Sequence, residues 1–275
     1  MAQAKKKATA MPARKKPTKP KKKSIGKKPA KPRRVKLRVD PKAFGNPRLK
    51  RFVAKIFKWT FVAILLLCMA PILLTILYIP SSVHPISTLM VSKWYQGEKV
   101  QRKWVRFEDI SPFVYQSVIS SEDGKFCFHR GVDWDAVNLV VDDLLEGEKP
   151  RGASTIPMQT VKNIYLWSSR SYIRKILEVP LALYVDFVWG KRRMMEIYLN
   201  IAEWGPGIYG IEAASRAYFK RSAKHLSRKQ AALLAVALPN PKLRNPKRPK
   251  RGMRRLARLV EGRAKASGAY VKCLK

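Results

Sequence analysis

Two acidic side chains stand next to each other near the middle of the chain, in a segment that is otherwise aromatic and basic. The segment reads EDGKFCFHRG and contains Glu122, Asp123, Phe126 and His129. A carboxyl group beside apolar rings has a raised pKa, which suits a group that exchanges a proton with a substrate. The segment therefore predicts a general acid or base. An acidic pair at a helix end beside a packed aromatic is the structural alternative.

A second segment, GASTIPMQTVKN, gathers neutral hydrogen-bonding groups around one cation. Its polar side chains are those of Ser154, Thr155, Gln159, Lys162 and Asn163. Hydroxyl, amide and ammonium groups can all donate hydrogen bonds, so the segment predicts contacts to phosphate or sugar oxygens. A loop that Ser or Thr caps is the structural alternative.

A third segment, RKILE, places two cations one helical turn before a carboxylate. Arg174 and Glu178 are four residues apart, so they share a face of a helix, with Lys175 beside them. An exposed ion pair is the commoner reason for such spacing. Two further segments are KRRMMEIYLN, which contains Asn200, and GIYGIEAASRAYF. Their structural alternatives are an amphipathic surface helix and a glycine-rich turn before a packed helix.

The elements that hold these segments are predicted to be mostly helices. Apolar spacing and capping residues predict helices that start at Pro112 and that cover 133–146, 172–200, 211–219 and 227–238. Pro180 is expected to kink or divide the third of these. We find no alternating strand series and no repeat, so the predicted fold class is mainly α.

The net charge of +40 is distributed unevenly over the 275 residues, and its distribution predicts a membrane anchor. Residues 1–58 carry 23 Lys or Arg and one acid in low-complexity sequence, which predicts a disordered tail. Residues 59–79 carry no charge and are long enough to span a bilayer. A buried core helix and a cleaved signal peptide are the weaker interpretations. Because the basic side of a spanning helix stays in the cytoplasm, residues 80–275 are expected on the outer side.

The rest of the chain divides into a connector at 80–101, a domain at 102–241 and a basic C-terminal tail at 242–275. The tail holds 13 basic residues and one acid. Basic tails bind nucleic acid or anionic lipid, and the scarcity of aromatics among the charges argues against nucleic acid. On the outer side, anionic membrane or glycan is the expected target. The three cysteines rule out a disulfide framework. A disulfide between Cys127 and Cys273 outside the cytoplasm and isolated packing cysteines are the two interpretations left open.

In their order and spacing, the five segments together resemble the motifs of the peptidoglycan glycosyltransferase family. The resemblance covers roughly residues 100–241 and includes the trailing ALLAVALPNP. With a single anchor and no second module, the chain is most similar to the monofunctional members of that family. The family resemblance implies a lysozyme-like helical domain with a membrane-proximal jaw, preceded by one transmembrane helix.

The resemblance also implies a reaction. Lipid II would be polymerised into linear glycan at the periplasmic face of the bacterial inner membrane by a single-pass enzyme. The growing chain on undecaprenyl diphosphate would be the donor and the 4-hydroxyl of the incoming lipid II the acceptor. The anomeric centre would invert to a β-1,4 bond with release of the lipid diphosphate. Cell-wall synthesis or division proteins are the expected protein partners.

Residue roles follow from the same resemblance. Glu122 takes the position of the base, and Glu178 is the second carboxylate, near the leaving diphosphate and acting through a divalent cation such as Mg²⁺ or Mn²⁺. The cations expected to stabilise the diphosphate are Lys162, Arg170, Arg174 and Lys175. The other residues expected to bind substrate are Asp123, Phe126, His129, Ser154, Thr155, Gln159, Asn163 and Asn200.

Three positions depart from the family pattern. Met158 stands where the family has the first of two glutamines, and Pro157 precedes it. Asp186 replaces the usual glutamate eight residues after Glu178, and Pro180 lies between the two.

A glycan-cleaving lysozyme-like enzyme and a non-enzymatic basic scaffold are the alternative functions. The cations for a diphosphate argue against the first, because a neutral glycan does not need them.

Overall fold

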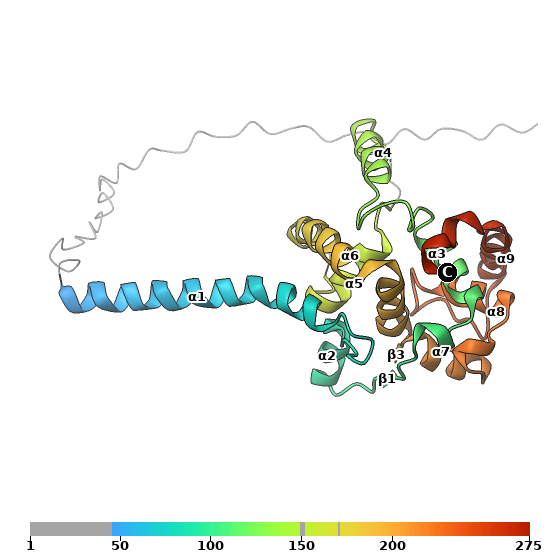
Figure 1. Cartoon of the computed structure of the whole chain (residues 1–275), viewed down its shortest axis with the longest axis horizontal. Helices are drawn as coiled ribbons and strands as arrows, with labels where there is room; N and C mark the ends of the chain where they lie inside the picture. Colours follow the sequence, from blue (N-terminus) through green and yellow to red (C-terminus); the bar gives the residue numbers. More distant parts are fainter. Residues whose placement is uncertain (1–45, 149–151, 170) are drawn as a thin grey trace, which may run out of the picture. The chain divides into compact units, whose positions relative to one another are not determined.

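The computed structural model of the protein describes residues 46–148, 152–169 and 171–275 (Figure 1). The chain divides into two compact units, residues 1–56 and 57–275. The described part of the first unit is the beginning of helix α1 (Pro47–Leu77), and the second unit holds the other described elements. These are mostly helices, which confirms the predicted fold class.

Helix α1 begins earlier than the sequence predicts. Its 31 residues contain most of the uncharged segment and are long and apolar enough to cross a membrane. The predicted disordered tail is wrong for residues 47–58, which are helical, while residues 1–45 lie outside the described part. Pro47 occupies the first helical position, where its missing N–H costs nothing, and no Pro or Gly follows until Pro71. The helix therefore continues through the basic residues.

The helices that periodicity predicts are all present. They are α3 (Pro112–Glu122), α4 (Trp134–Leu145), α6 (Tyr172–Ile201), α7 (Ile211–Phe219) and α8 (Arg228–Ala237). The expected caps are confirmed as well. The carboxylate of Asp133 accepts a hydrogen bond from the backbone N–H of Ala136 at 3.1 Å, and Ser227 forms a capping box with Gln230.

Periodicity does not predict two of the helices before residue 200, nor a small sheet. Helix α2 (Thr88–Tyr95) lies in the segment expected to be an extended connector, and α5 (Ile156–Tyr165) lies in the second polar segment. Strand β3 (Ile208–Tyr209) pairs in parallel with β1 (Gln101–Arg102) and antiparallel with β2 (Glu203–Gly205). Strands of two or three residues are too short to show the alternation that identifies a strand. Short 3₁₀ turns are η2 (Phe107–Asp109), η3 (Ala223–His225) and η4 (Ala269–Leu274).

Helix α6 departs from helical geometry at Gly190 and not at Pro180. Gly190 has φ 67° and ψ 171°, a conformation that glycine adopts at little cost. Pro180 lies in an uninterrupted part of the helix with an exposed side chain. The expected kink or division at Pro180 is therefore wrong, and the break ten residues later redirects the buried second half of α6.

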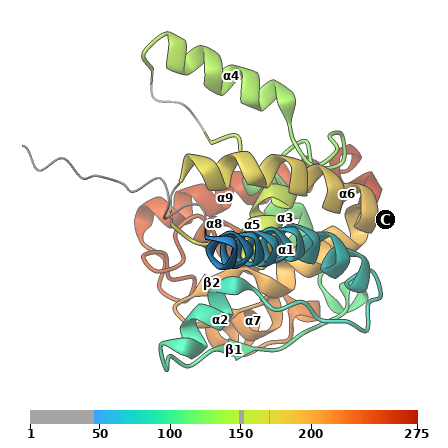
Figure 2. The ribbon, with the colours of Figure 1, turned by 90° about the vertical axis from the view of Figure 1, so that its left-hand side faces the viewer.

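The core is built around the second half of α6 and around α8. Every residue from Arg193 to Ile201 is buried, and so is every residue from Ala231 to Ala237. Small alanines along α8 let α3 and α9 (Arg251–Ala266) approach it closely. Helix α4 differs, since it buries none of its residues and stands apart from the other helices in both views (Figures 1 and 2).

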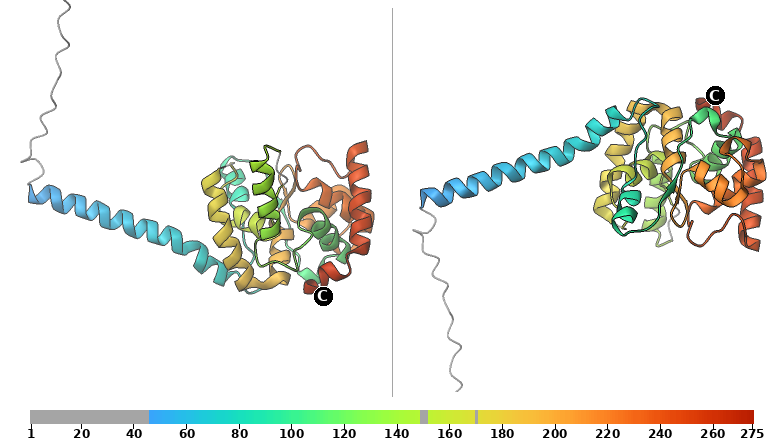
Figure 3. Two further views of the ribbon diagram at one scale, coloured as in Figure 1. Left: turned by 90° about the horizontal axis from the view of Figure 1, so that it is seen from above. Right: turned by 90° about the horizontal axis from the view of Figure 1, so that it is seen from below.

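The prediction that residues 242–275 form a tail is wrong, because most of them belong to the domain. Helix α9 packs against α3 and α8 and lies beside α8 at the edge of the domain (Figure 3). It buries Met253, Ala257, Val260 and Ala264, whose spacing of three and four residues marks one helical face. Six of the basic residues that gave the segment a tail-like composition occupy the other face of this helix.

A disulfide joins Cys127, in the loop after α3, to Cys273 in η4. It links residues that are 146 positions apart, so the disulfide interpretation is confirmed for these two cysteines. Cys68, on α1, is free and exposed. The C-terminal element is thereby attached to the loop that contains the first acidic segment.

Removing this disulfide is expected to lower the stability of the domain substantially. A cross-link over a long loop restricts the unfolded chain, and its loss typically costs about 2–5 kcal/mol. The Cys127→Ser/Cys273→Ser variant should therefore unfold at lower denaturant concentration than the parent protein. Cys68→Ser is the matched control and should unfold like the parent. Equal stability of the double variant would contradict the prediction.

Candidate active site

The C-terminal end of α3 presents Glu122 between two hydrogen-bond donors. Gln159 of α5 donates through Nε2 to Glu122 Oε2 at 3.2 Å, and the Ser121 hydroxyl donates to Oε1 at 3.2 Å. Burial raises the pKa of Glu122, while the two hydrogen bonds and the positive charge of Arg244 act in the opposite direction. Glu122 is thus a half-buried carboxyl group with a raised pKa, which fits a proton acceptor.

The neighbouring Asp123 has a structural role. It is buried, and its carboxylate contacts His129 Nε2 at 2.9 Å and accepts the backbone N–H of Ile156 at 2.9 Å. These contacts fasten the first segment to the start of α5. Phe126 is fully buried, with the ammonium of Lys191 4.8 Å from its ring centre. Asp123, Phe126 and His129 therefore position the loop.

The second segment becomes the cap and first turns of α5. Thr155 is the N-cap and donates its hydroxyl to the Gly131 carbonyl at 2.6 Å, so it too is a positioning residue. Met158 is buried in the core and replaces the hydrogen bonds expected of a glutamine there with apolar packing. Gln159 accepts a hydrogen bond from the hydroxyl of Tyr198 at 3.2 Å, which makes a chain from Tyr198 through Gln159 to Glu122.

The third segment opens α6, where Glu178 binds two cations. Glu178 is buried and forms ion pairs with Arg174 and with Lys175, the latter at 3.1 Å. The ammonium of Lys175 also donates to the hydroxyl of Ser154 at 2.7 Å. The alternative of an exposed ion pair is wrong, because the carboxylate is only 2% exposed. Glu178 holds both cations in place at the second segment.

Lys162 connects these two groups of residues electrostatically. Burial and the charge of Arg174 lower the pKa of Lys162, and the carboxylate of Glu122 opposes that shift. Burial, with Arg174 and Lys162, lowers the pKa of Lys175 to about 8. Three cations are therefore gathered at one site close to a carboxylate. Such a cluster fits a dianion such as a diphosphate.

A cavity of about 220 Å³ opens beside these residues. It is lined by Gln159, Lys162, Asn163 and Tyr198, together with Ser87, Leu89, Ile201, Ala202, Glu203, Leu238, Pro239 and Pro241. Four of the lining residues belong to the expected polar segments or to the chain that reaches Glu122. The predicted donors Gln159, Lys162 and Asn163 thus share one concave surface.

The structure does not bring every predicted residue to this surface. Asn200 is fully buried, accepts from the N–H of Val105 and donates to the carbonyls of Val105 and Glu196. Its amide is therefore occupied by backbone groups, which is the bonding of a residue that positions the chain. Arg170 lies outside the described residues.

Two residues at the site were not predicted. Tyr198 lies in the fourth segment, and burial with the charge of Glu122 raises its pKa well above the ordinary value. Arg244 comes from the supposed tail and donates to the carbonyl of Val236 at 2.7 Å. The fourth segment offered a signal for Tyr198, whereas local sequence offers none for Arg244.

The described residues do not fit a metal ion held by side chains alone. They contain no group of three or more His, Cys, Asp or Glu side chains placed to hold one. Both carboxylate oxygens of Glu178 already contact cationic side chains. Glu178 therefore acts here as an anchor for Arg174 and Lys175.

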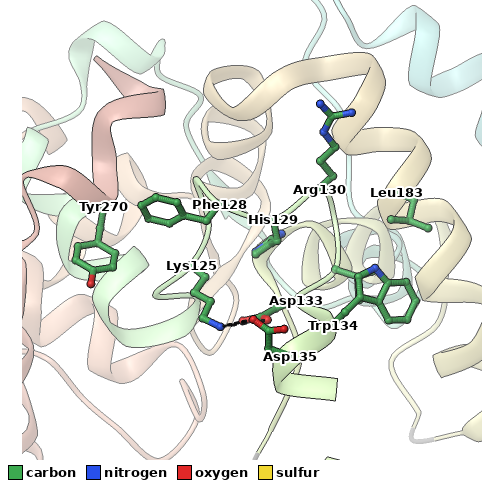
Figure 4. A pocket seen from close by; sticks show the side chains of 10 residues that line it. Lys125, Phe128, His129, Arg130, Asp133, Trp134, Asp135, Leu183 and Tyr270 are labelled. Atoms are coloured by element: carbon green, nitrogen blue, oxygen red, sulfur yellow. Dashed lines mark hydrogen bonds and ion pairs between the residues drawn. The ribbon is translucent and has the colours of Figure 1, made fainter. Parts of the chain in front are cut away.

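A larger cavity, of about 660 Å³, lies beside the first segment and is shown in Figure 4. Lys125 reaches Asp135 at 2.7 Å within it, and the rings of Phe128 and Tyr270 meet edge to face at its side. Neither Glu122 nor Glu178 lines this cavity. The smaller cavity does not include these two carboxylates in its lining either, but its Gln159 donates to Glu122 and its Lys162 acts electrostatically on the same carboxylate.

Comparison with known proteins gives one consistent result. Residues 88–265 match the family model described as transglycosylase. The chain is 60% identical over 209 residues to a biosynthetic peptidoglycan transglycosylase of Mesorhizobium japonicum, covering 76% of this chain and 89% of the relative. Relatives of the same description from Brucella suis and Rhizobium johnstonii are 58% and 53% identical, over 77% and 80% of this chain and 95% and 90% of their own lengths. The matched region extends through most of α9.

Proposed function

Because the chain belongs to the transglycosylase family and is a peptidoglycan glycosyltransferase that polymerises glycan strands, we propose that Glu122 is the base of this reaction. The observation that carries the proposal is the position of Glu122, half-buried with a raised pKa and within electrostatic range of Lys162. One site thereby supplies a proton acceptor and positive charge for a leaving group.

The proposed step uses lipid II as the acceptor. Glu122 takes the proton of its 4-hydroxyl, and the oxygen forms a bond to the anomeric carbon of the growing chain. The bond from that carbon to the diphosphate of the lipid carrier breaks, and the diphosphate leaves with the electron pair. Attack from the face opposite the leaving group inverts the centre and makes a β-1,4 bond. The two-carboxylate logic resembles that of glycosidases, with a sugar hydroxyl in place of water.

The leaving diphosphate is assigned to the cations of the second and third segments. Lys162, Arg174 and Lys175 can stabilise the charge that grows as the glycosidic bond breaks. Glu178 positions two of them through its ion pairs. Any divalent cation that takes part is proposed to be held chiefly by the diphosphate itself, because Glu178 has no free oxygen for it.

The membrane arrangement is proposed from the helix and the charges around it. Helix α1 is the candidate anchor, and the basic residues before its uncharged part favour a cytoplasmic N-terminus. The Cys127–Cys273 disulfide supports placing the domain outside the reducing cytoplasm, at the inner membrane. Helix α4 exposes Leu139, Leu144 and Leu145, which supports contact of this helix with lipid.

Incubation of the protein with lipid II tests the proposed function. Glycan polymer on a denaturing gel supports it. Shortened glycan strands without polymer formation would support a cleaving enzyme instead. The three clustered cations favour synthesis, because cleavage of an uncharged glycan releases no anion for them to stabilise.

The pH profile of kcat/KM is expected to be bell-shaped. Glu122 must be deprotonated to act as a base, so its raised pKa causes activity to fall at acidic pH. Lys175 must be protonated to bind the diphosphate, so activity falls as pH rises through about 8. A Lys175→Arg variant should move the alkaline limb to higher pH and leave the acidic limb in place. An unchanged alkaline limb in that variant would contradict the assignment.

A further inference from the structure

One strongly basic face of the domain is not used by the reaction as proposed. Residues 247–265 contain nine Lys or Arg and one acid, Glu261. Because α9 packs its apolar side inward, its basic side chains are exposed. Within the part of the chain that the structure describes, none of these nine cations forms an ion pair with a carboxylate. Their mutual repulsion is left uncompensated by the domain, which indicates an anionic ligand.

Four basic residues line a groove between α8 and α9, which we call the basic groove. Arg251, Arg254 and Arg258 follow one stripe of α9, and Lys229 faces them from α8. The groove has a volume of about 390 Å³, and its floor includes Leu233, Pro249 and Ala257. Glu261 is the one acidic residue at its edge. A concave surface with an apolar floor and guanidinium groups fits a chain that carries carboxylates.

Lys229 of the basic groove and the carbonyl that Arg244 binds lie near opposite ends of α8. Arg244, whose charge acts on Glu122, binds the carbonyl of Val236 near the end of that helix. Lys229 lies at the other end of α8, seven residues before Val236. At the rise of an α-helix this separation is about 10 Å. An extended peptide of about three residues covers the same distance.

We propose that the basic groove binds the acidic peptide that a peptidoglycan strand carries, and so holds a strand at the enzyme between transfers. The proposal rests on the proposed function, since the strand is its substrate and product. The carboxylates of such a peptide complement the four cations. A flat anionic bilayer matches a concave groove poorly. The face of α9 with Met253, Ala257, Val260 and Ala264 packs against α3 and α8, which leaves Leu256 and Leu259 as the exposed large apolar side chains of this helix.

Binding of a soluble ligand to the full-length protein tests the proposal without catalysis. The probe is a disaccharide that carries the acidic peptide, and its affinity is measured by calorimetry as salt is raised. The Arg254→Gln/Arg258→Gln variant is expected to bind it at least about tenfold more weakly, because two charge-assisted contacts are lost. The same disaccharide with amidated carboxyl groups should bind the parent protein as weakly as the probe binds this variant.

A matched control separates the groove from general charge. Arg255→Gln/Lys265→Gln removes two exposed cations from the same helix, outside the groove, and should leave the affinity within about twofold. Equal loss in both double variants would overturn the proposal in favour of diffuse electrostatic attraction. Tight binding of the amidated probe would overturn it in favour of sugar recognition.

Two further probes assign the face to another ligand if the proposal is wrong. Binding of phosphatidylglycerol vesicles or of a DNA duplex that depends on Arg254 and Arg258, with no binding of the peptide probe, would overturn it. A lipid II polymerisation assay of the Arg254→Gln/Arg258→Gln variant tests the proposed function separately from the groove. We expect shorter glycan products with transfer still present. Absence of polymer with the parent protein would refute the function and not the groove.

Discussion

The Glu122→Gln variant is expected to lose lipid II polymerisation by about 10²–10⁴-fold, the range that a positioned general base contributes. Glutamine has nearly the same shape as glutamate. Its amide oxygen can accept from Gln159, and its NH2 group can donate to the hydroxyl of Ser121 in place of the second bond. It cannot take a proton from the acceptor hydroxyl. The loss should therefore appear in the rate of polymer formation, with an unchanged thermal unfolding curve.

A control at a second carboxylate makes this result specific. Glu108 is exposed and pairs with Arg192 at 2.6 Å. The Glu108→Gln variant therefore removes a carboxylate that the proposed reaction does not use. Exposed ion pairs contribute little to stability. We expect the control to polymerise lipid II at the parent rate. Normal activity in Glu122→Gln would refute the assignment of the base.

The Lys162→Met variant is expected to lower kcat/KM by about 10²–10³-fold, as loss of a single charge-stabilising donor does in other active sites. Methionine fills a similar volume without the ammonium group, so the diphosphate loses one stabilising charge as it leaves. Lys162 is half-buried and has no ion-pair partner among the described residues. Removing its charge should therefore leave the domain as stable as before.

Two companion variants distinguish charge from packing at this position. Lys162→Arg keeps the positive charge and should retain clearly more activity than Lys162→Met. Lys224→Met removes an exposed lysine that pairs with Asp109 at 3.1 Å, and it should be fully active. If the arginine and methionine variants are equally impaired, Lys162 acts through its shape and not through its charge.

Local patterns in the sequence predicted five helices of the domain and the apolar segment of α1, but not α2, α5 or α9. Apolar spacing of three and four residues, together with Asp133 and Ser227 as caps, predicts helices that are present. The order of the five segments leads to Glu122 and to the cation cluster around Glu178. These features depend on residues close together in the chain, which is why sequence alone can reveal them.

Some polar residues of the motifs make hydrogen bonds within the protein. Asp123, Thr155 and Asn200 are polar residues within motifs, and they were expected to touch substrate. The structure occupies each of them with backbone groups. A motif identifies important residues. It does not show which of them contact the substrate and which of them position the residues that do. To distinguish the two roles, one must know the hydrogen-bond partners of each side chain in the tertiary structure.

Sequence by itself therefore determined the helical class, the apolar segment of α1 and the family, and it supplied the residues that are proposed for the chemistry. Only the tertiary structure decided that Glu122 meets Gln159, 37 residues away, and that Cys127 meets Cys273. It also decided that the basic C-terminal segment contains a helix packed into the domain, and that the charge of Arg244, in the loop before that helix, acts on Glu122. Periodicity and charge are local properties of the sequence. Such contacts arise from the packing of side chains that are far apart in the chain, and local properties do not predict them.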